Sequence, residues 1–210
     1  MKTILVTNWK GGSGKTTLAQ NLLVSAATSG FTVAGFDTDP QVQLAEWWEA
    51  RPDGVVPVTM YAQKLPEVVG LPIMDEPCDV LVIDTPPGVE AYPEAYKRVI
   101  AAADLIIIPC QPTRNDRASA KKTLDFLAAT GKPVITVLNR VKPRTTDIAK
   151  TRRELAGIGA DVCPVDIPDL TEVHRAGERG LGVAEIVGLK SSDDFNAIWA
   201  YARSRMGMTP

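Results

Sequence analysis

Short runs of apolar residues, rich in Val and Ile, alternate along this chain with longer stretches in which apolar residues recur at helical spacing. Runs such as VLVID and LIIIP are apolar at consecutive positions. Strands have this character when helices cover both faces of their sheet, so the runs predict strands inside a layered α/β fold. The predicted strands span residues 2–7, 32–37, 55–60, 79–84, 104–109, 133–139 and 161–164.

The stretches between the strands predict helices, because their apolar residues return about every three to four positions. This alternation predicts a doubly wound, mostly parallel sheet flanked by helices, whose ligands bind at the carboxyl ends of the strands. A length of 210 residues suits a single domain over residues 1–210. The predicted helices span residues 15–29, 41–49, 92–103, 116–130, 146–157 and 192–205, and the last of them gathers Phe195, Ile198, Trp199 and Ala202 on one face.

Charge and cysteine content narrow the classes of protein to which this chain can belong. The formal net charge is -2 and the sequence pI is near 5.5, so any contact with nucleic acid has to come from a local basic patch. Cys78, Cys110 and Cys163 never form a C-x-x-C pair, which argues against zinc, iron–sulfur and disulfide frameworks and suits a reducing cytoplasm. The first residues do not form a signal peptide, and no apolar run approaches the roughly 18 residues that span a membrane, so we expect a soluble protein.

A glycine-rich stretch, NWKGGSGKTT, follows the first predicted strand and leads into the first predicted helix. It almost matches the phosphate-binding P-loop pattern G-x-x-x-x-G-K-[ST], but Trp9 replaces the first glycine and Lys10 is an additional cation. In such a loop the backbone N–H groups and the helix N-terminus face phosphate oxygens, Lys15 reaches the outer phosphates, and the Thr16 hydroxyl binds magnesium. The residues predicted to bind the nucleotide here are Gly11, Gly12, Ser13, Gly14, Lys15, Thr16 and Thr17.

Two further motifs fall at strand ends, where this fold class places ligands. FDTDPQ supplies Asp37 and Asp39, and carboxylates beside phosphates would repel them unless a cation is present or one carboxylate holds a water. The alternative for Asp39 is a helix N-cap, since Pro40 suits the first helical position. VLVIDTPPG delivers Asp84 from a buried strand, which is the Walker B pattern that brings a carboxylate to the magnesium shell beside a P-loop. Residues 85–88 then form a stiff turn suited to sensing the γ-phosphate.

Together, K-G-G-x-G-K-T-T, D-x-D-P-Q and the apolar run before D-x-P-P-G resemble the ParA/MinD family of deviant Walker ATPases. The chain is most similar to the short ParA-type partition ATPases that lack an N-terminal DNA-binding domain. The resemblance implies that Lys10 is the signature lysine, which reaches across a dimer interface to the phosphates of the partner's ATP. It implies that Asp39 positions the hydrolytic water, and that Asp37 and Asp84 act in the shell of a Mg²⁺ cofactor. A cation supplied in this way stabilises charge on the transferring phosphoryl group, and the two ATP molecules would lie within an isologous dimer.

Later segments extend the resemblance. Family members use an asparagine at a strand end against adenine, which points to Asn139. The segment 164–170 is placed like the loop that flanks adenine, and from it Pro168 and Asp169 carry over. RAGERGLGVAEI resembles a late family element in which Gly180 caps the end of a helix.

One segment is strongly basic in a chain whose net charge is negative. Residues 140–153 read RVKPRTTDIAKTRR, with six basic residues against one acid. Residues alone leave two interpretations open, a solvated helix face and a DNA-binding patch. ParA-type dimers bind DNA non-specifically through basic residues, so the resemblance favours DNA, with salt-dependent binding and little sequence preference. The candidates are Lys142, Arg144, Lys150, Arg152 and Arg153, followed by Arg175, Arg179, Arg203 and Arg205.

The resemblance implies a Mg²⁺-dependent ATPase that forms a homodimer on binding ATP, binds DNA non-specifically and positions a cargo such as a plasmid, a chromosome region or a protein assembly. A ParB-like or other cargo-bound adaptor protein would stimulate hydrolysis, and the ATP-bound form would be cytoplasmic and associated with the nucleoid. One alternative is a membrane-associated positioning ATPase of the MinD kind, but the narrow apolar face of the last predicted helix suits packing on the core, so no membrane contact is expected. The other alternative is a P-loop metabolic enzyme, although iron–sulfur carriers of that class need paired cysteines that this chain lacks.

Overall fold

A computed structural model, which describes residues 1–68, 77–142 and 146–208, contains one seven-stranded sheet. Its strands pair in the order β3-β2-β4-β1-β5-β6-β7, and every pairing is parallel. The predicted doubly wound α/β fold is therefore confirmed. The strands are β1 Lys2–Val6, β2 Val33–Asp37, β3 Thr59–Ala62, β4 Val80–Asp84, β5 Leu105–Cys110, β6 Val134–Leu138 and β7 Asp161–Val162.

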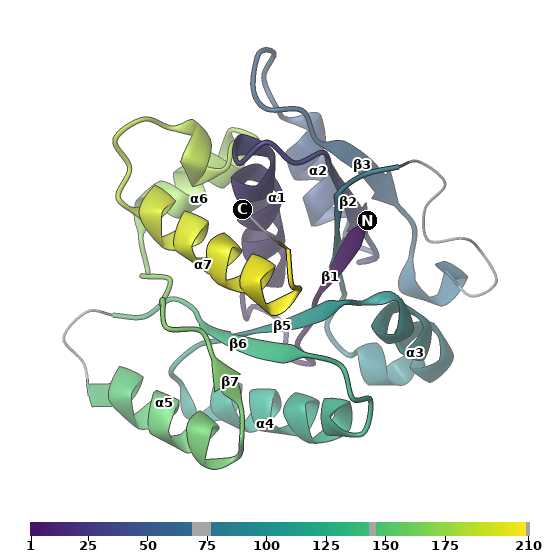
Figure 1. Cartoon of the computed structure of the whole chain (residues 1–210), viewed down its shortest axis with the longest axis vertical. Helices are drawn as coiled ribbons and strands as arrows, with labels where there is room; N and C mark the ends of the chain where they lie inside the picture. Colours follow the sequence, from purple (N-terminus) through teal and green to yellow (C-terminus); the bar gives the residue numbers. More distant parts are fainter. Residues whose placement is uncertain (69–76, 143–145, 209–210) are drawn as a thin grey trace.

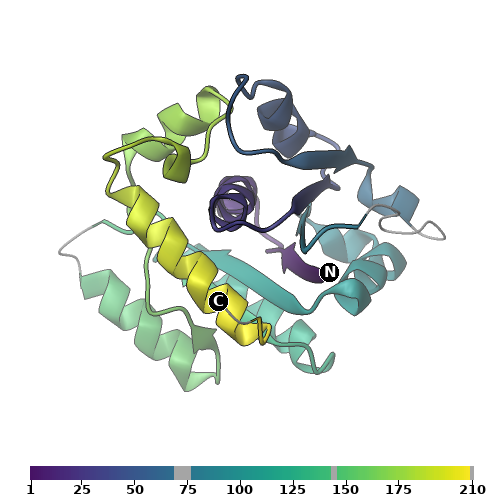
Figure 2. The ribbon, with the colours of Figure 1, turned by 45° about the horizontal axis from the view of Figure 1, so that its top comes forward.

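Helices cover both faces of the sheet. In Figure 1, α3, α4 and α5 lie on one side of the strands, and α1, α2, α6 and α7 lie on the other. Figure 2 shows the same arrangement from another angle, with α1 seen nearly end-on and α7 running across the view. Short 3-10 helices occupy Leu65–Val68, Val89–Ala91 and Val183–Glu185. The α-helices are α1 Lys15–Thr28, α2 Gln43–Glu49, α3 Pro93–Ala102, α4 Arg114–Ala128, α5 Thr146–Gly157, α6 Thr171–Glu178 and α7 Ser191–Arg205.

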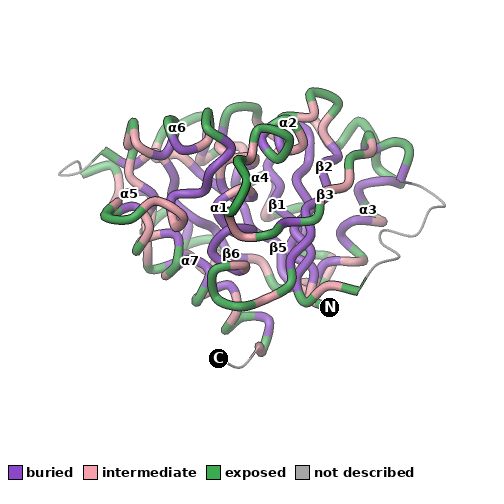
Figure 3. The backbone as a smooth tube through the Cα atoms, turned by 90° about the horizontal axis from the view of Figure 1, so that it is seen from above, coloured by how far each residue is buried: buried purple, intermediate pink, exposed green. Residues whose placement is uncertain are grey.

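Two hydrophobic cores lie on opposite faces of the sheet, and alternate residues of each strand belong to different cores. Ile4 and Val6 of β1 pack in the core beneath α1, α2, α6 and α7, whereas Leu5 packs in the core beneath α3, α4 and α5. Figure 3 shows the buried stretches gathered in the strands at the middle of the molecule. Successive side chains of a strand point to opposite faces, so a sheet covered twice needs apolar residues at consecutive positions. This explains the continuous apolar runs in the sequence.

Helix α7 turns its apolar face inward, as predicted. Phe195, Ile198 and Trp199 are buried, and they pack in the same core as α1. The apolar surface of α7 is thus covered by the chain itself. Within the described residues, no helix combines the length and the apolar character needed to span a bilayer.

The third strand differs from the prediction for residues 55–60, because β3 pairs with β2 only from Thr59 onward. The preceding residues satisfy their backbone groups elsewhere. The Val56 carbonyl accepts a hydrogen bond of 2.7 Å from the Arg51 guanidinium, and the Val56 N–H donates to Glu185 at 3.3 Å. Pro57 has no N–H to donate, so it could not have continued a ladder. The apolar pattern identified the strand but not its start.

Helix boundaries also shift where side chains cap them. Helix α2 begins at Gln43 and not at Gln41, and its N-cap is Val42. Helix α4 begins at Arg114, two residues before the predicted start, because the Thr113 hydroxyl caps it by accepting a hydrogen bond from the Asp116 N–H.

The glycine that follows α6 fixes the contact between α6 and α2. Gly180 adopts φ +68°, and its carbonyl accepts a hydrogen bond of 3.0 Å from Arg51, whose guanidinium also pairs with Glu185 at 2.7 Å. A Cβ at position 180 would lie 2.4 Å from the backbone carbonyl carbon of Ala50. Only glycine fits, because both the left-handed backbone and the close backbone contact exclude a side chain.

We therefore expect Gly180→Ala to lower the free energy of unfolding by about 3 kcal/mol or more, since it adds backbone overpacking to the cost of a left-handed alanine. Gly207→Ala is the matched control, because Gly207 has φ +67° and open space around its Cβ position. Gly207→Ala should lower the free energy of unfolding by only about 1–2 kcal/mol. Urea denaturation measures both, and equal losses would contradict the proposed backbone contact.

Candidate functional site

The sheet brings the three sequence motifs to one edge. Strand β4 lies between β1 and β2, and in the ladder Asp84 stands opposite Val6 on one side and opposite Asp37 on the other. Because the pairings are parallel, all three strands end at the same edge. The glycine-rich loop after β1, the D-x-D segment after β2 and the carboxylate of β4 are therefore neighbours in space.

The loop between β1 and α1 has the backbone shape of an anion cradle. Gly12 and Gly14 adopt φ +72° and +96°, a region in which side chains are strained. Among the described residues no side chain caps α1, and its first turn carries no acidic residue. The backbone N–H groups at a helix N-terminus attract anions when no carboxylate competes for them.

A cavity of about 320 Å³ opens above this loop. Two larger cavities, of about 510 Å³ and about 460 Å³, are not lined by the glycine-rich loop, although the first shares Arg140 with this cavity. Sequence reasoning missed three of the lining side chains, Gln41, Gln43 and Arg140. Arg140 has φ +50°, an unusual conformation for a residue other than glycine that no sequence pattern reveals. The cavity is lined by Gly11, Gly12, Gly14, Lys15, Thr16, Thr17, Asp39, Gln41, Gln43, Pro87 and Arg140.

Lys15 is buried at the base of the cavity. Its ammonium donates a hydrogen bond of 3.3 Å to the Lys10 carbonyl of the same loop. Burial lowers the pKa of Lys15, and the nearby carboxylates of Asp84 and Asp39 oppose that shift. A buried cation that donates a hydrogen bond this long is well suited to exchange it for a bond to a phosphate oxygen.

Asp84 is the most deeply buried acid of the site. Its Oδ2 accepts a hydrogen bond of 2.6 Å from the Thr16 hydroxyl, and its buried Oδ1 has no hydrogen-bond partner among the described residues. Burial raises the pKa of Asp84 to about 7, although the bond from Thr16 acts in the opposite direction. A carboxylate and a hydroxyl are oxygen ligands of the kind that Mg²⁺ prefers, and the unpartnered oxygen suits a cation or its bound water. The residues present therefore fit a magnesium ion beside the loop.

Asp37, the other predicted magnesium-shell acid, is directed at the protein backbone. One oxygen accepts the Asp39 N–H at 2.9 Å, and the other accepts the N–H groups of Leu44 and Ala45 at 2.9 and 3.0 Å. Burial raises the pKa of Asp37, and these backbone hydrogen bonds oppose the shift. The carboxylate thus satisfies the first turn of α2, and its contact with magnesium stays a prediction.

Asp39 is not the N-cap of α2, so the structural alternative for this residue was wrong. Its Oδ1 accepts a hydrogen bond of 2.9 Å from the Gln41 N–H, which closes a local turn before the helix begins. The residue is half-buried and lines the cavity above the glycine-rich loop. Capping therefore does not account for a carboxylate at this position.

The residues predicted to contact adenine gather beside the loop. The Asn139 amide donates a hydrogen bond of 2.8 Å to the Ser13 carbonyl, and a Cβ on Gly14 would lie 1.9 Å from that amide nitrogen. Pro168 forms a parallel bridge with Val141, and exposed Asp169 follows it. The cavity between them is only about 10 Å³, too small for a purine. Asn139 anchors the loop in this structure, and the adenine contacts stay predictions.

Trp9 has a role within its own chain. Its ring packs against Phe126 at 5.7 Å between centroids, and Phe126 stacks on Tyr96 at the same distance. The Trp9 carbonyl accepts a hydrogen bond of 3.1 Å from the Gly88 N–H, which ties the loop to the turn after β4. A large side chain at this position therefore fastens one end of the loop to α3 and α4 without obstructing its glycines.

Lys10 points away from the cavity above the loop. Its ammonium lies 2.5 Å from the carboxylate of Asp116 in α4, and its side chain lines a separate hollow with Trp9 and Asn115. In this conformation Lys10 does not contribute to the phosphate cavity of its own chain, whereas Lys15 does.

The predicted DNA-binding residues do not form one equivalent set. Arg152 forms an ion pair with Asp166 and donates hydrogen bonds to the carbonyls of Cys163 and Pro164, so it has partners within its own chain, and its contact with DNA stays a prediction. Arg144 lies outside the described residues. Lys142 is exposed, and Lys150 and Arg153 are exposed on α5. Of the second group, Arg175 and Arg179 are exposed, Arg205 pairs with Asp161, and Arg203 lies over the ring of Phe31.

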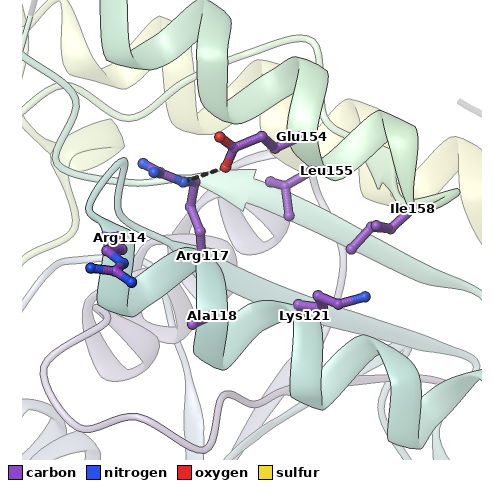
Figure 4. A pocket seen from close by; sticks show the side chains of 7 residues that line it. All are labelled: Arg114, Arg117, Ala118, Lys121, Glu154, Leu155 and Ile158. Carbon is purple, nitrogen blue, oxygen red and sulfur yellow. Dashed lines mark ion pairs between the residues drawn. The ribbon is translucent and has the colours of Figure 1, made fainter.

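A separate groove of about 460 Å³ runs between α4 and α5. Figure 4 shows Arg117 of α4 reaching toward Glu154 of α5, and their ion pair is 2.6 Å long. Leu155 and Ile158 form its apolar wall. The residues that line this groove include neither the glycine-rich loop nor a buried carboxylate, so we exclude it as the nucleotide site.

Comparison with known proteins agrees with this geometry. Residues 4–183 match the family model of the CobQ/CobB/MinD/ParA nucleotide binding domain. The chain is 26% identical over 206 residues to maintenance of carboxysome distribution protein A of Halothiobacillus neapolitanus, covering 93% of this chain and 94% of that protein.

Two solved structures share the fold at low sequence identity. A chain of the MinC:MinD cell division protein complex of Aquifex aeolicus superposes with a TM-score of 0.78 at 17% identity, covering 100% of this chain and 98% of that chain. An aspartate-to-alanine variant of McdA from Cyanothece, in complex with ATP, superposes with a TM-score of 0.77 at 19% identity and the same coverage.

The buried carboxyl of Asp84 predicts a pH-dependent stability. Because its pKa is raised to about 7 in the folded chain, its contribution to the free energy of unfolding is present below about pH 4 and is lost as the pH rises through about 7. Asp84→Asn should remove this loss, so without metal and nucleotide the variant becomes more stable than the wild type at pH 8. Urea denaturation in EDTA from pH 5 to pH 8 measures the difference, with Asp125→Asn as an exposed control. A difference between Asp84→Asn and wild type that is constant with pH would contradict it.

Proposed function

The chain belongs to the CobQ/CobB/MinD/ParA nucleotide-binding family, and we propose that it is a Mg²⁺-dependent ATPase that works in pairs to position a cargo. The observation that carries this proposal is the set of groups around one cavity. The N-terminus of α1, buried Lys15 and Asp39 line it, and Asp84 adjoins it through Thr16. Within the part of the chain that the structure describes, no side chain caps α1 and one oxygen of Asp84 has no hydrogen-bond partner. The phosphates of a nucleoside triphosphate would meet the helix N-terminus and the lysine, and its bound metal ion would meet the carboxylates.

The binding step uses the glycine-rich loop. Its backbone N–H groups and the N-terminus of α1 take the phosphate oxygens, and Lys15 exchanges its bond to the Lys10 carbonyl for the outer phosphates. Thr16 and Asp84 would hold Mg²⁺, which when bound neutralises charge on the phosphates. Asp37 supports this arrangement by fixing the start of α2 behind the site.

Asp39 is proposed to orient the attacking water. It lines the cavity, its Oδ1 closes only a local turn, and it is not needed to cap α2. A carboxylate in this position accepts a proton of the water as the water oxygen bonds to the γ-phosphorus and the bond from that phosphorus to the oxygen of the leaving ADP breaks. The turn of residues 85–88 touches the loop through Gly88 and Trp9, so it is suited to respond to the γ-phosphate.

Pairing is proposed to complete the site. Lys10 does not reach the phosphate cavity of its own chain. A cation contributed by a second copy would stabilise charge on the transferring group, and hydrolysis would then depend on dimerisation. We propose ATP as the nucleotide and a homodimer as the hydrolytic form.

The biological role is proposed from the relatives. The Halothiobacillus neapolitanus protein maintains carboxysome distribution, as its name states, and the cell-division protein MinD shares the fold. We propose that this chain positions a cargo, either a protein assembly or a DNA molecule, with an adaptor protein that stimulates hydrolysis. Exposed Lys150 and Arg153 on α5 support transient, non-specific binding to DNA. Such binding would keep the ATP-bound pair, in the cytoplasm, associated with the nucleoid.

Membrane attachment of the MinD kind is the weaker candidate, because the apolar face of α7 is buried in the core. A metabolic role would need a substrate pocket that continues from the phosphate cavity. The cavity beside Asn139 is almost closed, and the cavity of about 510 Å³ that shares Arg140 with the phosphate cavity is the place where such a substrate would have to bind. Sedimentation with lipid vesicles in the presence of ATP distinguishes the first alternative from binding to DNA.

Asp39→Ala is expected to bind ATP and to slow hydrolysis by about 100-fold or more, because the water loses its general base. ATP-bound pairs should then accumulate, as measured by analytical ultracentrifugation alongside phosphate release. Lys15→Ala is the control that should fail to bind ATP at all. Normal turnover by Asp39→Ala would exclude Asp39 as the residue that activates water, and tight ATP binding by Lys15→Ala would reject the nucleotide site.

Lys150→Glu with Arg153→Glu should weaken binding of the ATP-bound pair to DNA of any sequence. The slope of log affinity against log salt should become shallower by about one for each DNA phosphate that the variant no longer neutralises. The control is Lys64→Glu with Lys97→Glu, which makes the same charge change at exposed positions away from α5. Fluorescence anisotropy with a random duplex measures both pairs of substitutions. If both double variants lose the same affinity for DNA, the loss comes from net charge, and α5 is excluded as the DNA contact.

A further inference from the structure

The lysine proposed to act on a partner's nucleotide is held inside its own chain. Lys10 Nζ lies 2.5 Å from Asp116 Oδ2 in the first turn of α4. The Asp116 side chain is completely buried, whereas 38% of the Lys10 side chain is exposed. The carboxylate is thus a fixed part of the interior, and the cation is the member of the pair that is able to leave.

The surroundings of Asp116 make this ion pair strong. The Thr113 hydroxyl donates a hydrogen bond to Oδ2, the same oxygen that binds Lys10. The other oxygen, Oδ1, is buried and has no hydrogen-bond partner among the described residues. A buried carboxylate that loses its cation is left with little compensation, which is unfavourable.

The backbone of Lys10 is tied to the same helix. The Lys10 N–H donates a hydrogen bond of 3.0 Å to Asn8 Oδ1, which also accepts a hydrogen bond of 2.8 Å from the Ser119 hydroxyl of α4. The glycine-rich loop and α4 therefore meet at this lysine through both its backbone and its side chain. Movement of Lys10 toward another molecule would therefore alter contacts of both the loop and α4.

We propose that Asp116 stores Lys10 in the unpaired chain, and that ATP-dependent pairing exchanges this internal ion pair for the phosphates of the partner's nucleotide. The inference rests on the proposed function. Lys10 leaves the buried carboxylate only when enough phosphate charge is offered in return, so a triphosphate supports the exchange better than a diphosphate. Asp116 is a positioning residue that acts through Lys10 and sets the ATP concentration at which pairs form.

Asp116→Asn tests the proposal, because it removes the charge but keeps the shape of the side chain. Pairs should form at about tenfold lower ATP, since a hydrogen bond to a charged group is worth roughly one decade in an equilibrium constant. The turnover number at saturating ATP and protein should change by less than about twofold. Analytical ultracentrifugation across an ATP titration measures pairing, and phosphate release measures turnover.

Thr113→Val should shift the ATP concentration at which pairs form (the pairing threshold) in the opposite direction. Without the Thr113 hydroxyl, Asp116 depends more strongly on Lys10, so pairing should require more ATP. General destabilisation of α4 would shift both variants in the same direction, and thermal unfolding shows whether each is folded. Asp125→Asn, which removes an exposed carboxylate of the same helix, should leave the threshold unchanged.

The outcomes separate the two proposals. A wild-type chain that forms no pairs at any ATP concentration overturns the proposed function, and with it the storage role. A wild-type chain that pairs with ATP while Asp116→Asn pairs at the same or a higher ATP concentration overturns the storage role alone. Opposite shifts in Asp116→Asn and Thr113→Val support it.

Discussion

Parallel pairing of β2, β4 and β1 is the constraint on which the rest of the molecule depends. The hydrogen-bonded register places Val6, Asp84 and Asp37 side by side, so the segments that follow these strands begin at one edge. Covering both faces of the sheet with helices removes water from the strands. Polar groups at the edge are then partly buried, which raises the pKa of Asp84 and lowers that of Lys15. The chemistry of the site is a consequence of how the sheet is covered.

Both cations of the glycine-rich loop have internal partners. Lys15 donates to the Lys10 carbonyl, and Lys10 pairs with Asp116. A loop that contains several glycines and two cations would otherwise carry unbalanced charge at a helix N-terminus. These internal contacts hold the loop in a defined shape, and phosphates would have to replace them. The contact of Gly88 with Trp9 extends this coupling to the turn after β4, so loop, turn and α4 form one connected unit.

Much of the architecture could be predicted, because apolar periodicity reports how each element is buried. The strand pattern identified β1, β2, β4, β5 and β6 within about a residue at each end, and the face of α7 was correct. The errors fall where side-chain hydrogen bonds replace the backbone pairing or the helix cap that the local pattern predicts. Arg51 and Glu185 delay the start of β3, and Asp37 takes over the cap of α2. The Arg51–Val56 and Asp37–Leu44 contacts span only five and seven residues and the Glu185–Val56 contact spans 129, but all three depend on side-chain directions that the apolar pattern does not contain.

The sequence by itself determined the class of fold and the chemistry of the loop, because glycine spacing, lysine and strand-end carboxylates are local features with physical meanings of their own. Only the tertiary structure decided how each charge is used. It paired Arg152 with Asp166 and Lys10 with Asp116. It placed Asp39 at the wall of the cavity, and it left one oxygen of Asp84 without a hydrogen-bond partner among the described residues. The reason is that a charge acquires its role from the groups that replace its water, and those groups come from elements that meet only when the chain is folded.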